Sequence, residues 1–279
     1  MTATVPAIVR QRSGLRIRAY GATAAMMPKL FLAYQFQIWF NVVMEIFTLV
    51  ITVFFWRAVY GERALIGGLS ESQTLNYVIL ARIFHDGVYQ TNLIRSFGEF
   101  MREGGIVIRL LWPLDFQGVM YLQNLVHLGL NTMMRLPLAF LAVIFFQLPL
   151  PTSPVIWAAF VLTMLLGHGV MFCFDWMLAS TVLSVTDSWG LSTARAAFAV
   201  FFSGLLIPLD MMPPLLRTVA TLLPFSQAVY LPISVLSGLT PLTDLPSIWL
   251  VQIVYLVTLL TLSRSVFNRA IRLVTVQGG

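Results

Sequence analysis

Long apolar runs dominate the chain, and its charged residues gather between them. The clearest runs cover residues 36–56, 118–146, 155–180 and 248–262. A membrane-spanning helix needs about 20 mostly apolar residues. The runs stay apolar for many turns, whereas the strands of a transmembrane barrel alternate polar and apolar residues. Since a helix satisfies its own backbone hydrogen bonds in lipid, the pattern predicts an all-α integral membrane protein.

Two weaker segments complete a prediction of six transmembrane helices. Residues 193–207 are rich in small side chains, which favour close helix packing. Residues 72–92 are less hydropathic because they contain four polar or charged residues: Asn76, Arg82, His85 and Asp86. Before the first span, residues 20–35 are typical of an amphipathic interfacial helix.

Prolines punctuate the region between the fifth and sixth predicted spans, residues 208–243. It contains two apolar pieces, 214–223 and 226–236, each about half the length that a span needs. Because proline breaks helices, we expect a short extracellular re-entrant hairpin here. The alternative is one broken span, which would place the C-terminal arginines outside.

The composition supports membrane insertion, since 58% of residues are hydrophobic and 10% are charged. The net charge of +6 reflects arginines that the six-span topology places mostly on one side. Twelve basic residues would lie inside: Arg10, Arg12, Arg16, Arg18, Lys29, Arg95, Arg102, Arg109, Arg195, Arg264, Arg269 and Arg272. Only Arg57, Arg63 and Arg217 would lie outside.

The positive-inside rule therefore predicts that both termini are cytoplasmic. A bacterial cytoplasmic (inner) membrane is the expected location. We expect three parts: a basic segment with the interfacial helix at 1–35, the transmembrane domain at 36–265, and a cytoplasmic tail at 266–279. The net charge is interpreted as contact with anionic lipid, not with nucleic acid.

Three stretches, in this order, resemble the permease subunit of a type-2 ABC exporter. They are "YQFQIWFNVVMEIFTLVITVFFWRAVYG", "FMREGGIVIRLLWPLD" and "FFSGLLIPLDMMPPLLRTVATLLPFSQAVYLPISVLSG". The resemblance spans about Tyr20 to Arg264, and is to the kind often found as paired permeases with a separate ATPase. It implies an exporter of an amphipathic substrate: a drug-like molecule, lipid, glycolipid or peptide. It also implies a second permease, identical or similar, and ATPase subunits that bind ATP and magnesium.

The resemblance further implies a cytoplasmic coupling helix in residues 94–116, where charge is densest. The charged residues there have helical spacing, and Gly104-Gly105 would end the helix. The expected ATPase-docking residues are Arg95, Phe97, Glu99, Phe100, Arg102, Glu103 and Arg109. An ordinary solvated loop is the alternative.

The chain has no ATPase motif of its own. Its only lysine, Lys29, does not follow a glycine, as the P-loop requires. The three histidines, His85, His127 and His168, lie on three predicted spans, so no metal-ligand spacing is present. No G-x-S-x-G element of a hydrolase occurs. We expect no catalytic residue, metal or cofactor in this chain.

Ionisable groups at lipid depth usually face a bundle interior or a cavity. We expect a translocation path or polar network from Glu45, Arg82, His85, Asp86, Asn124, His127, Asn131 and Arg135. Arg82 and Asp86 are spaced to pair, as a gate or as a structural lock. The four polar residues of the third span form a stripe that lines a path or bonds helices together. Glu45 is a candidate partner for Arg135 or Arg82.

Three rival interpretations remain at this point. An ion-coupled carrier could use Arg82, Asp86 and Glu45 as a proton relay, and a membrane-embedded enzyme could use the same groups. Carriers often have helices broken near the midplane in repeated halves, whereas the breakers here cluster in 208–243. A non-transporting scaffold would not need the polar stripe. Asp175, in the fourth span, is predicted near its cytoplasmic end.

Overall fold

The structure, a computed structural model, describes residues 19–26, 28, 35–85, 93–111, 114–183 and 188–273. The described part is helical, apart from an isolated bridge between Ile66 and Leu69. Four long helices dominate it: α2 (Gln35–Tyr60), α7 (Phe116–Phe146), α8 (Pro154–Val182) and α13 (Leu245–Ala270). All four are long and apolar enough to cross a membrane. The chain is therefore an integral membrane protein, as predicted.

The shorter helices leave the number of spans at four or five among the described residues. Helix α3 (Glu71–Phe84) and helix α9 (Ser188–Phe202) have 14 and 15 residues and cover parts of the two weaker predicted spans. Helix α10 (Pro214–Leu222) meets the segment Pro224–Leu236 at an angle of 73°. That bent pair is either one broken span or a re-entrant loop, the two alternatives left open by the sequence.

The remaining short elements connect these helices. Two of them, α5 (Leu93–Arg102) and α6 (Gly105–Leu110), lie between α3 and α7. Helices α11 (Pro224–Ala228) and α12 (Tyr230–Leu236) form the second arm of the bent pair. Three 3-10 turns complete the described part: η1 (Leu209–Met211), η2 (Leu242–Asp244) and η3 (Ile271–Leu273).

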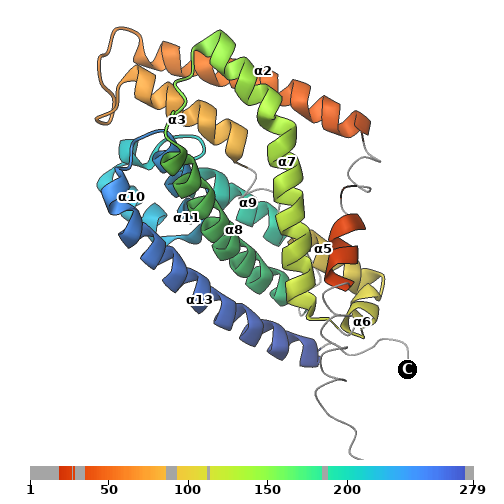
Figure 1. The fold of residues 1–279 in the computed structure, drawn as a ribbon. Coiled ribbons are helices and arrows are strands. Elements are labelled where there is room, and N and C mark those ends of the chain that lie inside the picture. Colours follow the sequence, from red (N-terminus) through yellow and green to blue (C-terminus); the bar gives the residue numbers. More distant parts are fainter. Residues whose placement is uncertain are drawn as a thin grey trace, which may run out of the picture.

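Local sequence signals fix several helix ends. Ser70 and Gln73 form a capping box at the start of α3, and Asp115 accepts a bond from the Gly118 amide at the start of α7. Pro154 occupies the first turn of α8, where its missing N–H costs nothing. Helix α7 continues through Pro137, and Figure 1 shows it bent toward its C-terminal end, as the proline predicts.

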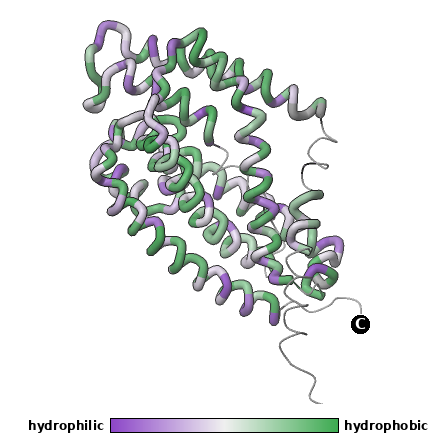
Figure 2. The backbone as a smooth tube through the Cα atoms, in the orientation of Figure 1, coloured by the Kyte–Doolittle hydropathy of each residue, from purple (hydrophilic) through white to green (hydrophobic). Residues whose placement is uncertain are grey.

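Helix α8 is the centre of the bundle. It packs against α13, α11, α12 and α5, and half of its span is buried, against 11% for α13. Figure 1 shows α2 at one edge of the bundle and α13 at the opposite edge. Hydrophobic residues cover most of the long helices, and hydrophilic ones gather near α5 and α6 and in the loops at the other end (Figure 2). This distribution suits a protein whose two ends face water.

Candidate functional site

Helix α5 is anchored to the bundle by one apolar face. Leu93, Ile94 and Phe97 are buried, and the ring of Phe97 is wholly inaccessible. The Phe97 ring centroid lies 5.0 Å from that of Trp176 in α8 and 5.8 Å from that of Phe116 in α7. Phe267 of α13 completes this aromatic cluster, 6.3 Å from Phe97. Movement of α5 would therefore displace the ends of three long helices together.

The opposite face of α5 is charged and open to solvent. Arg95, Glu99, Arg102 and Glu103 are exposed, whereas Phe100 is partly covered. The guanidinium of Arg109 in α6 lies 4.0 Å above the Phe100 ring. Partial burial lowers the pKa of Arg109. Of the seven predicted docking residues, six thus lie on or beside this open face, and Phe97 lies inside the protein.

Two glycines shape the ends and the packing of α5. Gly104 adopts φ 67°, the left-handed conformation of a helix C-cap, so α5 ends where the sequence predicts. Gly98 lies so close to α9 that a Cβ there would collide with the Ser188 side chain. Arg95 Nε also donates a 3.3 Å hydrogen bond to Ser192 Oγ of α9. Helix α5 is thereby joined to α9 as well as to the aromatic cluster.

The N-terminal helical residues 19–26 contact the same end of the bundle. Tyr20 Oη accepts a 3.2 Å hydrogen bond from the Asp115 amide. The Asp115 carboxylate also pairs with Arg264 of α13 at 3.0 Å. Residues 1–18, Lys29, Trp112 and Pro113 lie outside the described part of the chain.

A polar cluster lies deeper, where α2, α3 and α7 meet. Arg135 Nη2 is 3.7 Å from Glu45 Oε1, and His85 Nε2 is 3.8 Å from the same oxygen. Arg135 Nη1 lies 2.7 Å from His85 Nδ1 and donates a 3.4 Å bond to the backbone oxygen of Arg82. The sequence offered Arg135 and Arg82 as partners of Glu45, and the structure pairs Glu45 with Arg135.

The other predicted network residues are less closely joined. Asn124, His127 and Asn131 lie in α7 at helical spacings that place them on the side of Arg135, and all three are partly exposed. Asn124 Nδ2 bonds back to the Met120 oxygen of its own helix at 2.9 Å. Asp86 lies outside the described residues. The predicted Arg82–Asp86 pair is therefore untested.

Sequence reasoning missed the tightest ion pair in the described part of the chain. Asp175 of α8 and Arg195 of α9 form a bidentate pair, with Nε–Oδ1 at 2.8 Å and Nη2–Oδ2 at 2.6 Å. Their side chains are 0% and 6% exposed. The available signal was an acid in one apolar span followed by an arginine in the next, because such charges usually pair.

The described residues offer no metal centre, since no three His, Cys, Asp or Glu side chains among them gather closely enough. The long apolar helices enclose a polar cluster and carry an amphipathic, charged helix at one end. These features define a membrane-embedded helical protein. A family model described as an ABC-2 family transporter protein matches residues 46–278. The chain therefore belongs to this family, which confirms the predicted resemblance.

Two further comparisons gave no match, one with curated proteins and one with solved structures. Family membership identifies the chain as the membrane component of an ABC-2 transporter. Such permeases generally work with ABC ATPase subunits, and no nucleotide site is implied in this chain. The family does not indicate the substrate.

Proposed function

We propose that this chain is the permease of an ATP-driven exporter whose ATPase subunits are separate polypeptides docked on α5 and α6. The permease pairs with a second copy or a similar chain. It has six spans, two of them built on α3 and α9, with an extracellular hairpin at 208–243 and both termini in the cytoplasm. With the buried Arg195 set aside, eleven basic residues lie inside and three outside, which supports this orientation in a bacterial cytoplasmic membrane.

The two-faced character of α5 is the observation that carries the proposal. Its charged face offers Glu99, Arg102 and Glu103 to a partner, while Phe97 on its other face is fixed among the ends of α7, α8 and α13. A force applied to such a helix is transmitted directly to the spans, because close-packed side chains move as a unit. An ordinary solvated loop has no need of this anchor.

The polar cluster of Glu45, His85 and Arg135, extended by the α7 stripe, supports a path for an amphipathic substrate. Charged and amide groups at this depth interact with the polar part of a substrate, and the surrounding apolar helices with the rest. The drug-like molecule, lipid, glycolipid or peptide classes all fit this chemistry. Outward movement would follow from alternating access driven by the ATPases.

A pull-down with a candidate ATPase tests the docking surface. We expect the detergent-solubilised wild type to retain the ATPase and the Glu99→Arg/Glu103→Arg variant to lose it, because two attractive charges become repulsive. The matched control is Glu62→Arg/Asp244→Arg, which reverses two exposed acids at the opposite end of the bundle.

The outcomes separate the parts of the proposal. Retention by the control and loss by the α5 variant supports docking on α5. Equal retention by both variants contradicts docking on this face. Failure of the wild type to retain any ATPase contradicts the exporter itself. Size-exclusion profiles must match the wild type, so that unfolding is not mistaken for lost binding.

A further inference from the structure

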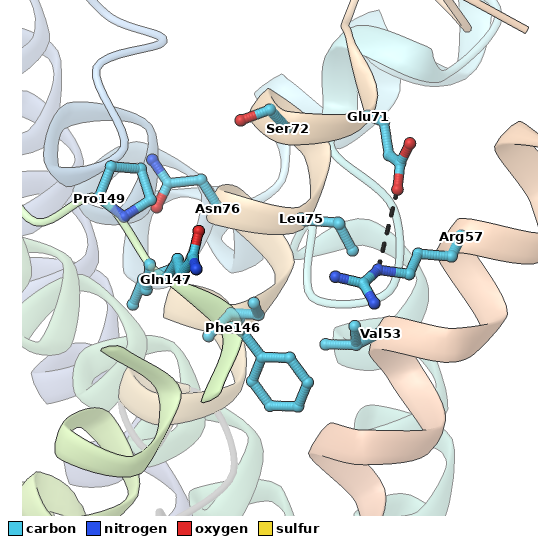
Figure 3. Close-up of a pocket in the computed structure, with 11 residues that line it drawn as sticks. Val53, Arg57, Glu71, Ser72, Leu75, Asn76, Phe146, Gln147 and Pro149 are labelled. Carbon is cyan, nitrogen blue, oxygen red and sulfur yellow. Dashed lines mark ion pairs between the residues drawn. The ribbon is translucent and has the colours of Figure 1, made fainter. Parts of the chain in front are cut away.

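A cavity of about 280 Å³ opens at the end of the bundle opposite α5 and α6. It lies between the last turn of α2, the first turns of α3 and the end of α7. We call it the outer pocket. Its lining residues include Arg57, Glu71, Asn76 and Gln147. Figure 3 shows Arg57 and Glu71 on one side of it, with Asn76 and Gln147 on the other. A cavity of this size accepts a head group or a small solute.

The outer pocket presents one positive and one negative charge that hold each other only loosely. Arg57 Nε and Glu71 Oε1 are 3.9 Å apart, which is beyond hydrogen-bond distance. Both side chains are about half exposed, at 50% and 44%. An exposed pair of this kind contributes little to stability, so a ligand can separate the two charges at small cost. The complementary ligand carries a phosphate-like anion and a cation.

Glu71 indicates what kind of cation that is. Its carboxylate lines the pocket, is about half exposed and has only acceptor atoms, so the pocket favours a ligand that supplies N–H groups. A primary ammonium has three such donors, whereas the quaternary ammonium of choline has none.

The position of the outer pocket favours a lipid as the source of that head group. Arg57 lies in the last turn of α2, and Gln147 ends α7 at φ 51°, so the pocket lies at the ends of two candidate spans. Head groups occupy this depth. Beside the pocket, Phe54 and Phe55 of α2 are 61% and 58% exposed, and Phe145 of α7 is 72% exposed. These apolar surfaces can receive acyl chains.

We propose that the outer pocket binds a phospholipid with a primary-amine head group. Its phosphate pairs with Arg57, its ammonium pairs with Glu71, and its chains lie along α2 and α7. The site requires only that the chain spans a membrane. It is independent of ATPase docking on α5, so either proposal can fail while the other stands.

Native mass spectrometry of the purified protein tests the site. Dioleoyl phosphatidylethanolamine and dioleoyl phosphatidylcholine are offered together at equal concentration, and the retained amounts are compared. We expect the ethanolamine lipid to be preferred about tenfold, since bonds from a charged donor account for that much affinity. Glu71→Gln should bring the ratio close to one, and Arg57→Gln should weaken retention of both lipids.

Glu62→Gln and Arg63→Gln are matched controls, because both residues are exposed in the adjacent loop and neither lines the pocket. Both should retain the wild-type preference. Glu71→Gln changes a half-exposed residue, so this variant should fold. Equal retention of the two lipids by the wild type overturns the proposal, as does an equal loss in the control variants.

A soluble competitor distinguishes a lipid from a free solute. O-phosphorylethanolamine carries the same two charges without acyl chains. We expect it to leave the bound lipid in place at concentrations where the diacyl lipid exchanges, because it lacks the apolar contacts with α2 and α7. Displacement at equal concentration would overturn the lipid assignment and identify a site for a small zwitterionic solute.

Discussion

Two charged sites inside the bundle are built in opposite ways. Asp175 and Arg195 form two hydrogen bonds of 2.8 and 2.6 Å, and both side chains are almost fully buried. Glu45 and Arg135 approach only to 3.7 Å, and their side chains keep 22% and 14% exposure. The tight pair is a fixed joint between α8 and α9. The contact between Glu45 and Arg135, which we call the loose pair, joins α2 to α7 over a longer distance.

The surroundings of the two sites explain this difference. Helix α8 is the most buried span, and charges there must be paired and hydrogen-bonded to be tolerated. The guanidinium of Arg195 also lies 6.0 Å from the Phe225 ring of α11. Helix α2 is at the edge of the bundle, where only 17% of its span is buried. Glu45 of α2 can therefore lie farther from Arg135 at little cost in free energy.

Breaking the tight pair should have the largest effect. Asp175→Asn removes the buried carboxylate that forms two hydrogen bonds with Arg195, and breaking a buried ion pair by removing one charge costs roughly 3–5 kcal/mol. We expect a large drop in the thermal unfolding midpoint of the detergent-solubilised protein. Asp244→Asn is the matched control, since Asp244 is exposed at the start of α13 and should leave the midpoint unchanged.

The double variant Asp175→Leu/Arg195→Met sharpens this test. Removing both charges avoids the uncompensated guanidinium, and buried pairs replaced by apolar residues often lose little stability. We expect its midpoint to lie well above that of Asp175→Asn. A double variant as unstable as the single one would show that the loss came from packing and not from the isolated charge.

An intermediate effect is expected at Gly98, which places α5 against α9 beside this joint. In Gly98→Ala the new methyl group collides with Ser188, and overpacking of this kind costs about 1–3 kcal/mol. Ser188→Gly in the same chain should restore the unfolding midpoint. Gly129→Ala in α7 is the control, because nothing lies within 4 Å of its added Cβ. A destabilised control or an unrescued double variant would contradict the close approach of α5 and α9.

The sequence predicts the long spans well because length and hydropathy are local properties. The predicted segment 118–146 corresponds to α7 (Phe116–Phe146), and 155–180 to α8 (Pro154–Val182). The sequence likewise predicts that Gly104 ends α5, because a left-handed C-cap depends mainly on the residue at that position. Topology and the full number of spans depend on segments that are short or interrupted, so hydropathy alone decides them less sharply.

Contacts between helices are where sequence reasoning is incomplete. Asp175 and Arg195 lie on separate helices, and nothing in their spacing reveals that they meet. Glu45 had two candidate partners until the fold selected Arg135. Phe97 was expected on the docking face, although its helical spacing from Leu93 and Ile94 places all three on one side. Helical periodicity alone could have assigned Phe97 to the core.

The smallest loss of stability is expected from substitutions in the loose pair of Glu45 and Arg135. Glu45→Gln removes a charge that lies 3.7 Å from Arg135 and 3.8 Å from His85, and partly exposed pairs of this kind contribute about 1 kcal/mol or less. Unfolding of Glu45→Gln, Arg135→Gln and the double variant in the same detergent measures the coupling between the two residues. We expect a coupling below about 1 kcal/mol, as a rearrangeable contact requires. A loss comparable to that of Asp175→Asn would mean that both sites are fixed joints, and α2 would then be bound to α7 as firmly as α9 is to α8.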